Sequence, residues 1–320
     1  MRLLLRTRFL DDPLRALAGR HGVEAAIAPD TDTLLREAPN ADALCLWPDF
    51  YDAALRDALA HAAPRMRWLQ LVTMGYDKVE AHGAPRGVLV TNAGDAYAPT
   101  VAEHAVASAL ALLRRIPEAV RRAERRDWAQ AAVAPSVGTL NGATVTVLGF
   151  GNIGRAVAER VRAFDARVVA VTRSGTPDPL AHETHAIGAL HDVLSRTDAL
   201  IVAVPLNGET RALVGAAALA ALPAHAIVVN VARGAVIDQR ALAAALRDGR
   251  LGGAALDVVD PEPLPADDPL WNAPNVLITP HVAGFGGAVP ARRVVALIER
   301  NLQRFLAGDP LEARVPAREA

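Results

Sequence analysis

The most constraining stretch of this chain is a glycine-rich turn that lies between a strand-like run and a helix-like run. The turn reads Gly149-Phe150-Gly151-Asn152-Ile153-Gly154 and fits the pattern Gly-x-Gly-x-x-Gly. Residues 143–148 before it are typical of a strand, and residues 155–161 after it are typical of a helix. Alone the pattern is a weak signal, but in this context it lets the backbone approach a pyrophosphate at a helix N-terminus. We therefore predict a dinucleotide site that includes Gly149, Gly151, Asn152, Ile153 and Gly154.

Short apolar runs alternate with helical patterns through the whole chain, which is the rhythm of parallel sheets. The predicted strands of a first domain are residues 3–5, 23–27, 43–46, 68–71 and 88–90; those of a second lie near residues 145, 168, 201, 228, 254 and 276. One long helical pattern covers residues 100–128, with a bend expected at Pro117, and a last one covers 290–307. The expected fold class is α/β, with two doubly wound parallel-sheet domains.

Three residues downstream of the turn, each after a short apolar run, suit one reaction: Arg233, Glu262 and His281. A guanidinium grips a carboxylate with its planar fork and leans on the neighbouring carbonyl oxygen. A histidine donates a proton near neutral pH, and a nearby carboxylate keeps its imidazole protonated and oriented. Singly, each residue fits an ordinary surface or structural role. In this order they indicate a site that holds a 2-oxo acid while a bound nicotinamide delivers hydride.

The segments that carry these residues closely resemble the D-isomer-specific 2-hydroxyacid dehydrogenases. The matching strings are residues 230–238, 255–259, 260–264 and 279–284, within a likeness that runs from about Leu69 to Pro310. The resemblance implies a Rossmann cofactor domain over residues 99–286 and a discontinuous, flavodoxin-like substrate and catalytic domain over 1–98 and 287–320. It also implies an active site in the cleft, a homodimer, and catalytic roles for Arg233, Glu262 and His281. It adds Asp257 as a contact to the nicotinamide end, although an aspartate that ends a strand is often a turn or cap residue.

Substrate contacts are expected from the first domain. The segment Val72–Asp77 lies where related enzymes present backbone N–H groups to the substrate carboxylate. Met74 and Gly75 are therefore candidate substrate-binding residues, because glycine permits a close approach. The alternative is a plain strand-to-helix turn. The candidate aromatic residues for a specificity wall, any of which could instead be core, are Trp47, Phe50, Tyr51, Tyr76, Tyr97 and Phe285.

The form of the cofactor is indicated by the end of the second nucleotide-domain strand. Where an NAD-specific site usually carries an acidic residue for the ribose diol, this chain has Thr172-Arg173-Ser174. An arginine flanked by hydroxyls suits a 2'-phosphate, so NADP is the preferred cofactor and NAD the alternative, with Arg173 then stacked on adenine or exposed. Val204 and Pro205 complete the predicted cofactor contacts.

Composition excludes several classes of protein. The net charge is −1 and the pI about 6.8, so no overall field attracts nucleic acid or anionic lipid. Cys45 is the sole cysteine, which excludes an internal disulfide and a thiolate metal cluster. The uncharged stretch 212–232 is interrupted by Pro223, His225 and Asn230, so it is interpreted as buried structure rather than a membrane span. The first six residues lack the apolar length of a signal peptide, and cytoplasmic residence is expected.

Two local patterns are set aside. Paired arginines at 114/115, 121/122 and 125/126 are mixed with acidic residues and indicate a solvated helix face or a subunit contact rather than nucleic-acid binding. The string His182-Glu183-Thr184-His185 lacks the four-residue histidine spacing of a helical zinc motif, and the nearby prolines favour a loop. No metal site is predicted.

The sequence thus predicts a reductase that converts a small 2-oxo acid to the 2-hydroxy acid with NADPH, with glyoxylate or hydroxypyruvate as the first substrates to consider. One alternative keeps the fold but uses NAD on a phosphoglycerate- or lactate-like compound. Formate oxidation is disfavoured because the matching family members carry glutamine where this chain has Glu262. A second alternative is a non-catalytic, dinucleotide-responsive binding protein on the same scaffold.

Overall fold

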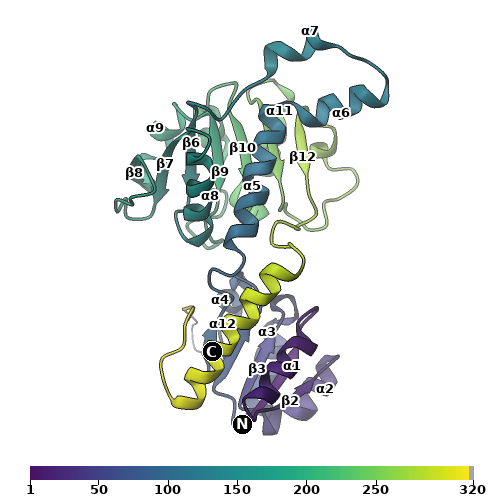
Figure 1. The fold of residues 1–320 in the computed structure, drawn as a ribbon, viewed down its shortest axis with the longest axis vertical. Coiled ribbons are helices and arrows are strands. Elements are labelled where there is room, and N and C mark those ends of the chain that lie inside the picture. The colour runs from purple at the N-terminus through teal and green to yellow at the C-terminus, as the bar shows by residue number, and fades with distance from the viewer. Residues whose placement is uncertain (317–320) are drawn as a thin grey trace. The chain divides into compact units, whose positions relative to one another are not determined.

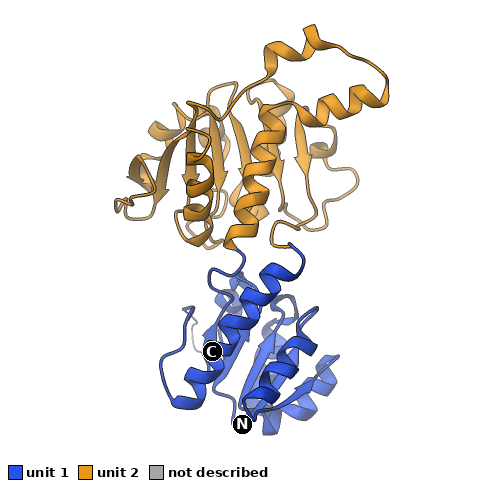
Figure 2. Ribbon diagram, in the orientation of Figure 1, with its two compact units in different colours: residues 1–97, 286–320 blue, residues 98–285 orange. Residues whose placement is uncertain are grey.

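The structure, a computed structural model, describes residues 1–316, which form two compact units (Figure 2). Unit 1 comprises residues 1–97 and the chain from residue 286 onward, and unit 2 comprises residues 98–285. Each unit contains one parallel sheet, so the predicted α/β class with two parallel-sheet domains is confirmed. The cofactor and substrate roles assigned to the two units remain predictions.

Unit 1 is built on a five-stranded sheet in the order β2-β1-β3-β4-β5, which is the flavodoxin-like order. Its strands are β1 Arg2–Arg6, β2 Glu24–Ile27, β3 Ala43–Leu46, β4 Trp68–Leu71 and β5 Leu89–Thr91. Its helices are α1 Asp11–Arg20, α2 Thr31–Glu37, α3 Ala53–Ala62, α4 Asp77–His82 and α12 Ala288–Ala307 (Figure 1). Strands β3 and β4 are buried at every residue, as expected where helices cover both faces of a parallel sheet.

Helix α12 belongs to unit 1 although unit 2 separates it from the rest of that unit in the sequence. Its apolar face buries Val294, Ile298 and Leu302 in the same cluster as Leu3. The Phe305 ring lies 5.4 Å from the ring of the fully buried Trp68. Burial of this face fixes α12 on the sheet of unit 1, because apolar burial is the main favourable term in such packing.

Unit 2 is built on a seven-stranded sheet in the order β12-β11-β10-β9-β6-β7-β8, the doubly wound order of a Rossmann domain with one added strand. Its strands are β6 Thr144–Leu148, β7 Arg167–Thr172, β8 Glu183–Ala186, β9 Ala199–Val202, β10 Ile227–Asn230, β11 Gly253–Leu256 and β12 Val276–Ile278. Its helices are α5 Ala98–Leu113, α6 Ile116–Glu124, α7 Gln130–Val133, α8 Asn152–Arg162, α9 Leu190–Leu194, α10 Ala216–Ala221 and α11 Gln239–Arg247. The strand order reverses between β6 and β9, where ligands of such sheets bind.

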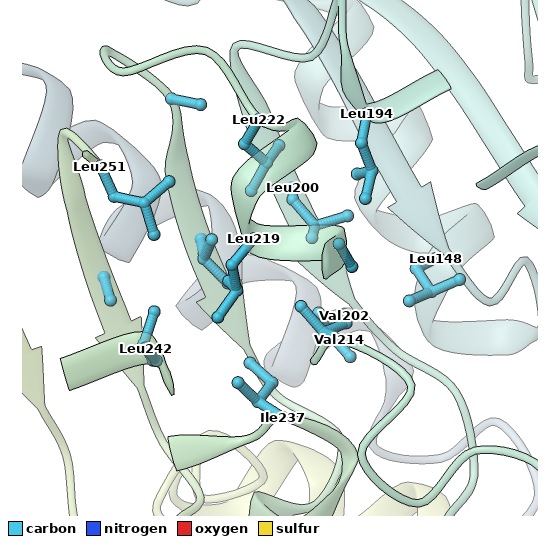
Figure 3. Close-up of a cluster of buried hydrophobic side chains, with 14 of the residues drawn as sticks. Leu148, Leu194, Leu200, Val202, Val214, Leu219, Leu222, Ile237, Leu242 and Leu251 are labelled. Carbon is cyan, nitrogen blue, oxygen red and sulfur yellow. The ribbon is translucent and has the colours of Figure 1, made fainter. Parts of the chain in front are cut away.

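An apolar cluster of unit 2 lies between the sheet and helices α9, α10 and α11 (Figure 3). Leu200 and Val202 of β9 pack there with Leu219 of α10 and Leu242 of α11. The uncharged stretch 212–232 forms α10 and β10 inside this unit. Among the described helices, none has both the length and the apolar character needed to cross a bilayer.

Two predicted elements were wrong. The helix expected over 100–128 ends at Leu113 and restarts at Ile116, because Arg115 adopts a left-handed conformation (φ 54°). Pro117 therefore lies in the first turn of α6 and bends nothing, since proline is tolerated there. The loop expected around Glu183 is strand β8, which pairs with β7 at the edge of the sheet. Its half-exposed residues lack the apolar run that marks the inner strands.

Candidate active site

The three residues predicted as catalytic follow three neighbouring strands of unit 2. Arg233 comes after β10, Glu262 after β11 and His281 after β12, and β11 lies between the other two strands in the sheet. Because the strands are parallel, their carboxyl ends meet at one edge. The structure therefore brings together a cation, a carboxylate and an imidazole from separate parts of the sequence.

The turn that carries Arg233 is shaped by Asn230, a buried residue that the sequence analysis did not single out. The Asn230 side chain accepts a hydrogen bond from the backbone N–H of Ala232 and donates one to the carbonyl of Arg233, both at 3.0 Å. Gly234 follows because a Cβ there would overlap the backbone of Val259. This close approach fixes the Arg233 turn against the segment that leads to Glu262.

His281 and Glu262 form a hydrogen-bonded ion pair, with 2.8 Å between Nδ1 and Oε2. The hydrogen bond that Glu262 accepts from His281 raises the pKa of His281 above its usual value, against the opposing effects of burial and of Arg233. Burial alone would raise the pKa of Glu262, but the contacts with His281, the Val259 N–H and Arg233 lower it. The pair therefore favours imidazolium and carboxylate, and it leaves Nε2 of His281 for another partner.

Asp257 holds the turn that carries His281. Its buried carboxylate accepts hydrogen bonds from the Thr279 hydroxyl at 2.7 Å and from the backbone N–H groups of Val282 and Ala283, each at 2.9 Å. Its carbonyl accepts the N–H of His281 at 2.8 Å. These contacts make Asp257 a turn residue of the His281 loop, and its predicted contact with the nicotinamide end stays a prediction.

The glycine turn has the shape that a diphosphate requires. Gly149 has φ +92°, and a Cβ there would lie 2.7 Å from the carbonyl carbon of Ala203 and 2.8 Å from a methyl of Val204, so only glycine fits. Gly154 would collide with the Gly149 carbonyl if it carried a Cβ. At Gly151, the N-cap residue of α8, a Cβ would meet no atom within 4 Å. The turn thus packs tightly against Val204 and stays open where backbone N–H groups would meet phosphate, so it fits the group.

The three residues predicted to bind the 2'-phosphate, at the end of β7, differ in their contacts. The Thr172 hydroxyl accepts the N–H of Gly175 at 2.9 Å, and the Ser174 hydroxyl lies 2.7 Å from that of Thr176. The Arg173 side chain is 81% exposed, with its Nε 3.7 Å from Oε2 of Glu209, a carboxylate that the sequence analysis did not foresee. Arg173 is therefore placed to meet an anion, in competition with an acidic neighbour.

The predicted substrate contacts of unit 1 follow β4. The Met74 carbonyl accepts a hydrogen bond from Asn92 at 2.7 Å, which fixes the start of the turn that contains Gly75. Of the aromatic candidates, Tyr51 is fully buried and its hydroxyl donates to the Gly83 carbonyl at 2.7 Å, so it is a core residue. Tyr97 likewise bonds a backbone carbonyl, that of Val72. Substrate binding by Met74 and Gly75 stays a prediction.

Comparison with known proteins places this geometry in a family. Residues 106–283, more than half of the chain, match the family described as D-isomer specific 2-hydroxyacid dehydrogenase, NAD binding domain. The glyoxylate reductase of Thermococcus kodakarensis is 34% identical over 287 residues, which cover 87% of this chain and 84% of that protein. The D-3-phosphoglycerate dehydrogenase of Mycobacterium bovis is 35% identical over 309 residues. That alignment covers 96% of this chain but 57% of the relative, so the chain spans little more than half of that enzyme's length.

A solved structure shows the same architecture over nearly the full chain. The NADPH-dependent glyoxylate/hydroxypyruvate reductase of Sinorhizobium meliloti, in complex with NADP and malonate, superposes with a TM-score of 0.79 at 28% identity. The match covers 100% of this chain and 98% of the other.

Proposed function

Since the chain belongs to the D-isomer specific 2-hydroxyacid dehydrogenase family, we propose that it reduces a small 2-oxo acid to the corresponding 2-hydroxy acid with a nicotinamide dinucleotide. The observation that carries the proposal is the hydrogen bond between His281 and Glu262 on the sheet edge that also presents Arg233. In this proposal His281 is the general acid, Glu262 keeps it protonated, and Arg233 is the cation for the substrate carboxylate.

Each residue of the triad has one task in this reaction. The Arg233 guanidinium binds the substrate carboxylate and polarises the adjacent carbonyl. His281, held through Nδ1 by Glu262, donates the Nε2 proton to the carbonyl oxygen. The bound cofactor supplies the hydride that goes to the carbonyl carbon. One proton and one hydride are added in total, which gives the hydroxyl group of the product.

Glyoxylate and hydroxypyruvate are the proposed substrates. Relatives named glyoxylate reductase align over most of both chains. The decisive experiment is steady-state turnover of purified protein against a panel of 2-oxo acids with each reduced cofactor. Turnover of glyoxylate or hydroxypyruvate over many equivalents of enzyme would support the proposal. Preference for a phosphorylated or lactate-like acid would replace the substrate, and binding without turnover would indicate a dinucleotide-responsive binding protein.

NADPH is the proposed cofactor, and the support is the exposed Arg173 at the end of β7. Only NADPH carries the 2'-phosphate, so Arg173→Ala should weaken NADPH binding by roughly 10- to 150-fold, the effect of losing a charge-assisted hydrogen bond, and change NADH binding little. Glu209→Gln should strengthen NADPH binding, because it removes a competing carboxylate. Dissociation constants for both cofactors test both changes. Equal weakening of both cofactors by Arg173→Ala would contradict the assignment and make Arg173 an adenine-side packing residue.

A homodimer is proposed through the segment that leaves the body of unit 2 between α5 and β6 (Figure 1). We call residues 116–136 of this segment the arm. Ile116 and Val120, one helical turn apart on α6, are 51% and 53% exposed, and Trp128 is 89% exposed. Three large apolar side chains exposed on one projecting element favour an association surface there. A second copy of this chain is the proposed partner.

A further inference from the structure

His104, a histidine on helix α5, lies at the end of a hydrogen-bonded chain that leads to the His281 turn. Its Nε2 is 3.0 Å from the hydroxyl oxygen of Thr279 and 3.6 Å from Oδ1 of Asp257. Thr279 in turn donates its hydroxyl proton to Oδ1 of Asp257 at 2.7 Å. A hydroxyl has one proton, so with that proton on Asp257 the contact with His104 requires an N–H at Nε2. The order of donation is therefore His104 to Thr279 to Asp257.

The far end of this chain controls the backbone on both sides of His281. Asp257 accepts the N–H groups of Val282 and Ala283 through its carboxylate and that of His281 through its carbonyl. His281 itself has φ +53°, a left-handed conformation that non-glycine residues rarely adopt because it is strained. Such a conformation persists only where the surrounding contacts impose it. Asp257 supplies three of the hydrogen bonds that hold the backbone of residues 281–283 in place.

We propose that His104 is a positioning residue for His281, acting through Thr279 and Asp257 from the helix behind the site. The inference rests on the proposed function, in which His281 is the proton donor. Without the N–H of His104, the Thr279 hydroxyl is free to rotate away from Asp257, and the carboxylate loses one of its three donors. The turn then loosens, and the 2.8 Å contact between His281 and Glu262 is weakened. His104 touches neither substrate nor cofactor in this scheme.

The test measures the pKa of His281 directly by NMR, so it does not depend on catalytic turnover. The charged groups that face His281 are Glu262, Arg233 and Asp257, and none of them is altered in the test variants. In protein labelled with ¹³C-histidine, the His281 resonance is identified by its loss in His281→Ala. His104→Leu and Thr279→Val are each expected to lower the pKa of His281 from its raised value. His104→Gln, which keeps an N–H donor near the Nε2 position, should restore most of it.

Two controls separate positioning from general damage. His225→Leu removes a histidine–aspartate contact on the surface of the same unit, with Asp198 at 2.6 Å, and should leave the His281 titration unchanged. Dinucleotide affinity should stay within about twofold in every variant, since the glycine turn is untouched. Combining His104→Leu with Thr279→Val should lower the pKa of His281 no further than Thr279→Val alone, because both act along one route.

The kinetic expectation is a fall in kcat of about 3- to 10-fold for His104→Leu, the usual effect of one lost neutral hydrogen bond, with KM changed less. An unchanged His281 titration in both His104→Leu and Thr279→Val overturns the proposal, and additive effects in the double variant overturn the route through Thr279. If the wild type turns over no 2-oxo acid, the proposed reaction fails. The titration still decides whether His104 positions His281.

Discussion

At the scale of single residues, the proposed reaction depends on the protonation state of His281. The hydrogen bond that Glu262 accepts from His281 raises the pKa of His281, and the proposed reduction consumes the imidazolium form. The rate is therefore retained below that pKa and lost as the pH rises through it. Any change that removes the partner carboxylate moves this loss to lower pH.

Glu262→Gln tests this directly. The amide cannot hold a charge against the imidazolium, so the pKa of His281 falls and the alkaline limit of kcat for reduction shifts to lower pH. A pH profile of kcat for wild type and variant measures the shift. His281→Ala, as a companion, should abolish most turnover and spare dinucleotide binding. An alkaline limit that does not move would remove Glu262 from the role.

Arg233→Lys tests the anchor, because lysine keeps the charge but loses the planar fork. Losing a charge-assisted hydrogen bond costs about 1.5 to 3 kcal/mol, so kcat/KM for the oxo acid should fall roughly 10- to 150-fold. The dinucleotide Kd serves as the control and should change little. A variant that weakens only dinucleotide binding would place Arg233 at the cofactor instead.

What the sequence could show at this scale was residue type and order. Arg233, Glu262 and His281 each follow a readable strand and each has a chemistry of its own, so their convergence was predictable. Asn230 and His104 were not, since an asparagine at a strand end and a histidine in a helix are ordinary residues until their partners are known. The hydrogen bonds that the carboxylate of Asp257 accepts from the N–H groups of Val282 and Ala283 were not predictable either, because they depend on the path of the following turn.

At the scale of elements, apolar runs located the inner strands because both faces of those strands are buried. Strands β3 and β4 were predicted with their observed bounds. Strand β8 was missed because an edge strand buries little and carries polar residues. The break after α5 was missed because its cause is distant: the N–H of Gly138 bonds the Leu113 carbonyl, and Arg115 bonds the carbonyl of Ser136. Those contacts come from Ser136 at the end of the arm and from Gly138 just beyond it.

The arm carries a prediction of its own. Val120→Asp places a charge among its exposed apolar residues and should weaken self-association by at least about tenfold, or 1.4 kcal/mol. Sedimentation velocity over a concentration series measures the change. Val289→Asp is the matched control, because Val289 is similarly exposed, at 49%, on α12. A wild type that stays monomeric at every concentration would refute the dimer.

At the scale of the whole molecule, each unit has its own apolar core, so we expect the two units to unfold independently. Saturating NADPH at about 100 times its Kd should stabilise the binding unit by about 2.7 kcal/mol. Hydrogen exchange should show this as slower exchange in β6, β7 and β9 of unit 2, with β1 and β3 of unit 1 little changed. Equal slowing in both units would mean that they unfold as one.

Unit 2 is a continuous insert of 188 residues, from 98 to 285, between two parts of unit 1. During synthesis, at about 5 to 20 residues per second, the first part of unit 1 must wait roughly 10 to 40 s for α12 to leave the ribosome. During that interval the apolar surface around Leu3 and Trp68 is not yet covered by α12. The nascent chain therefore completes unit 2 before unit 1, although unit 1 begins first. We expect chaperones to bind the exposed apolar surface of unit 1 during that interval.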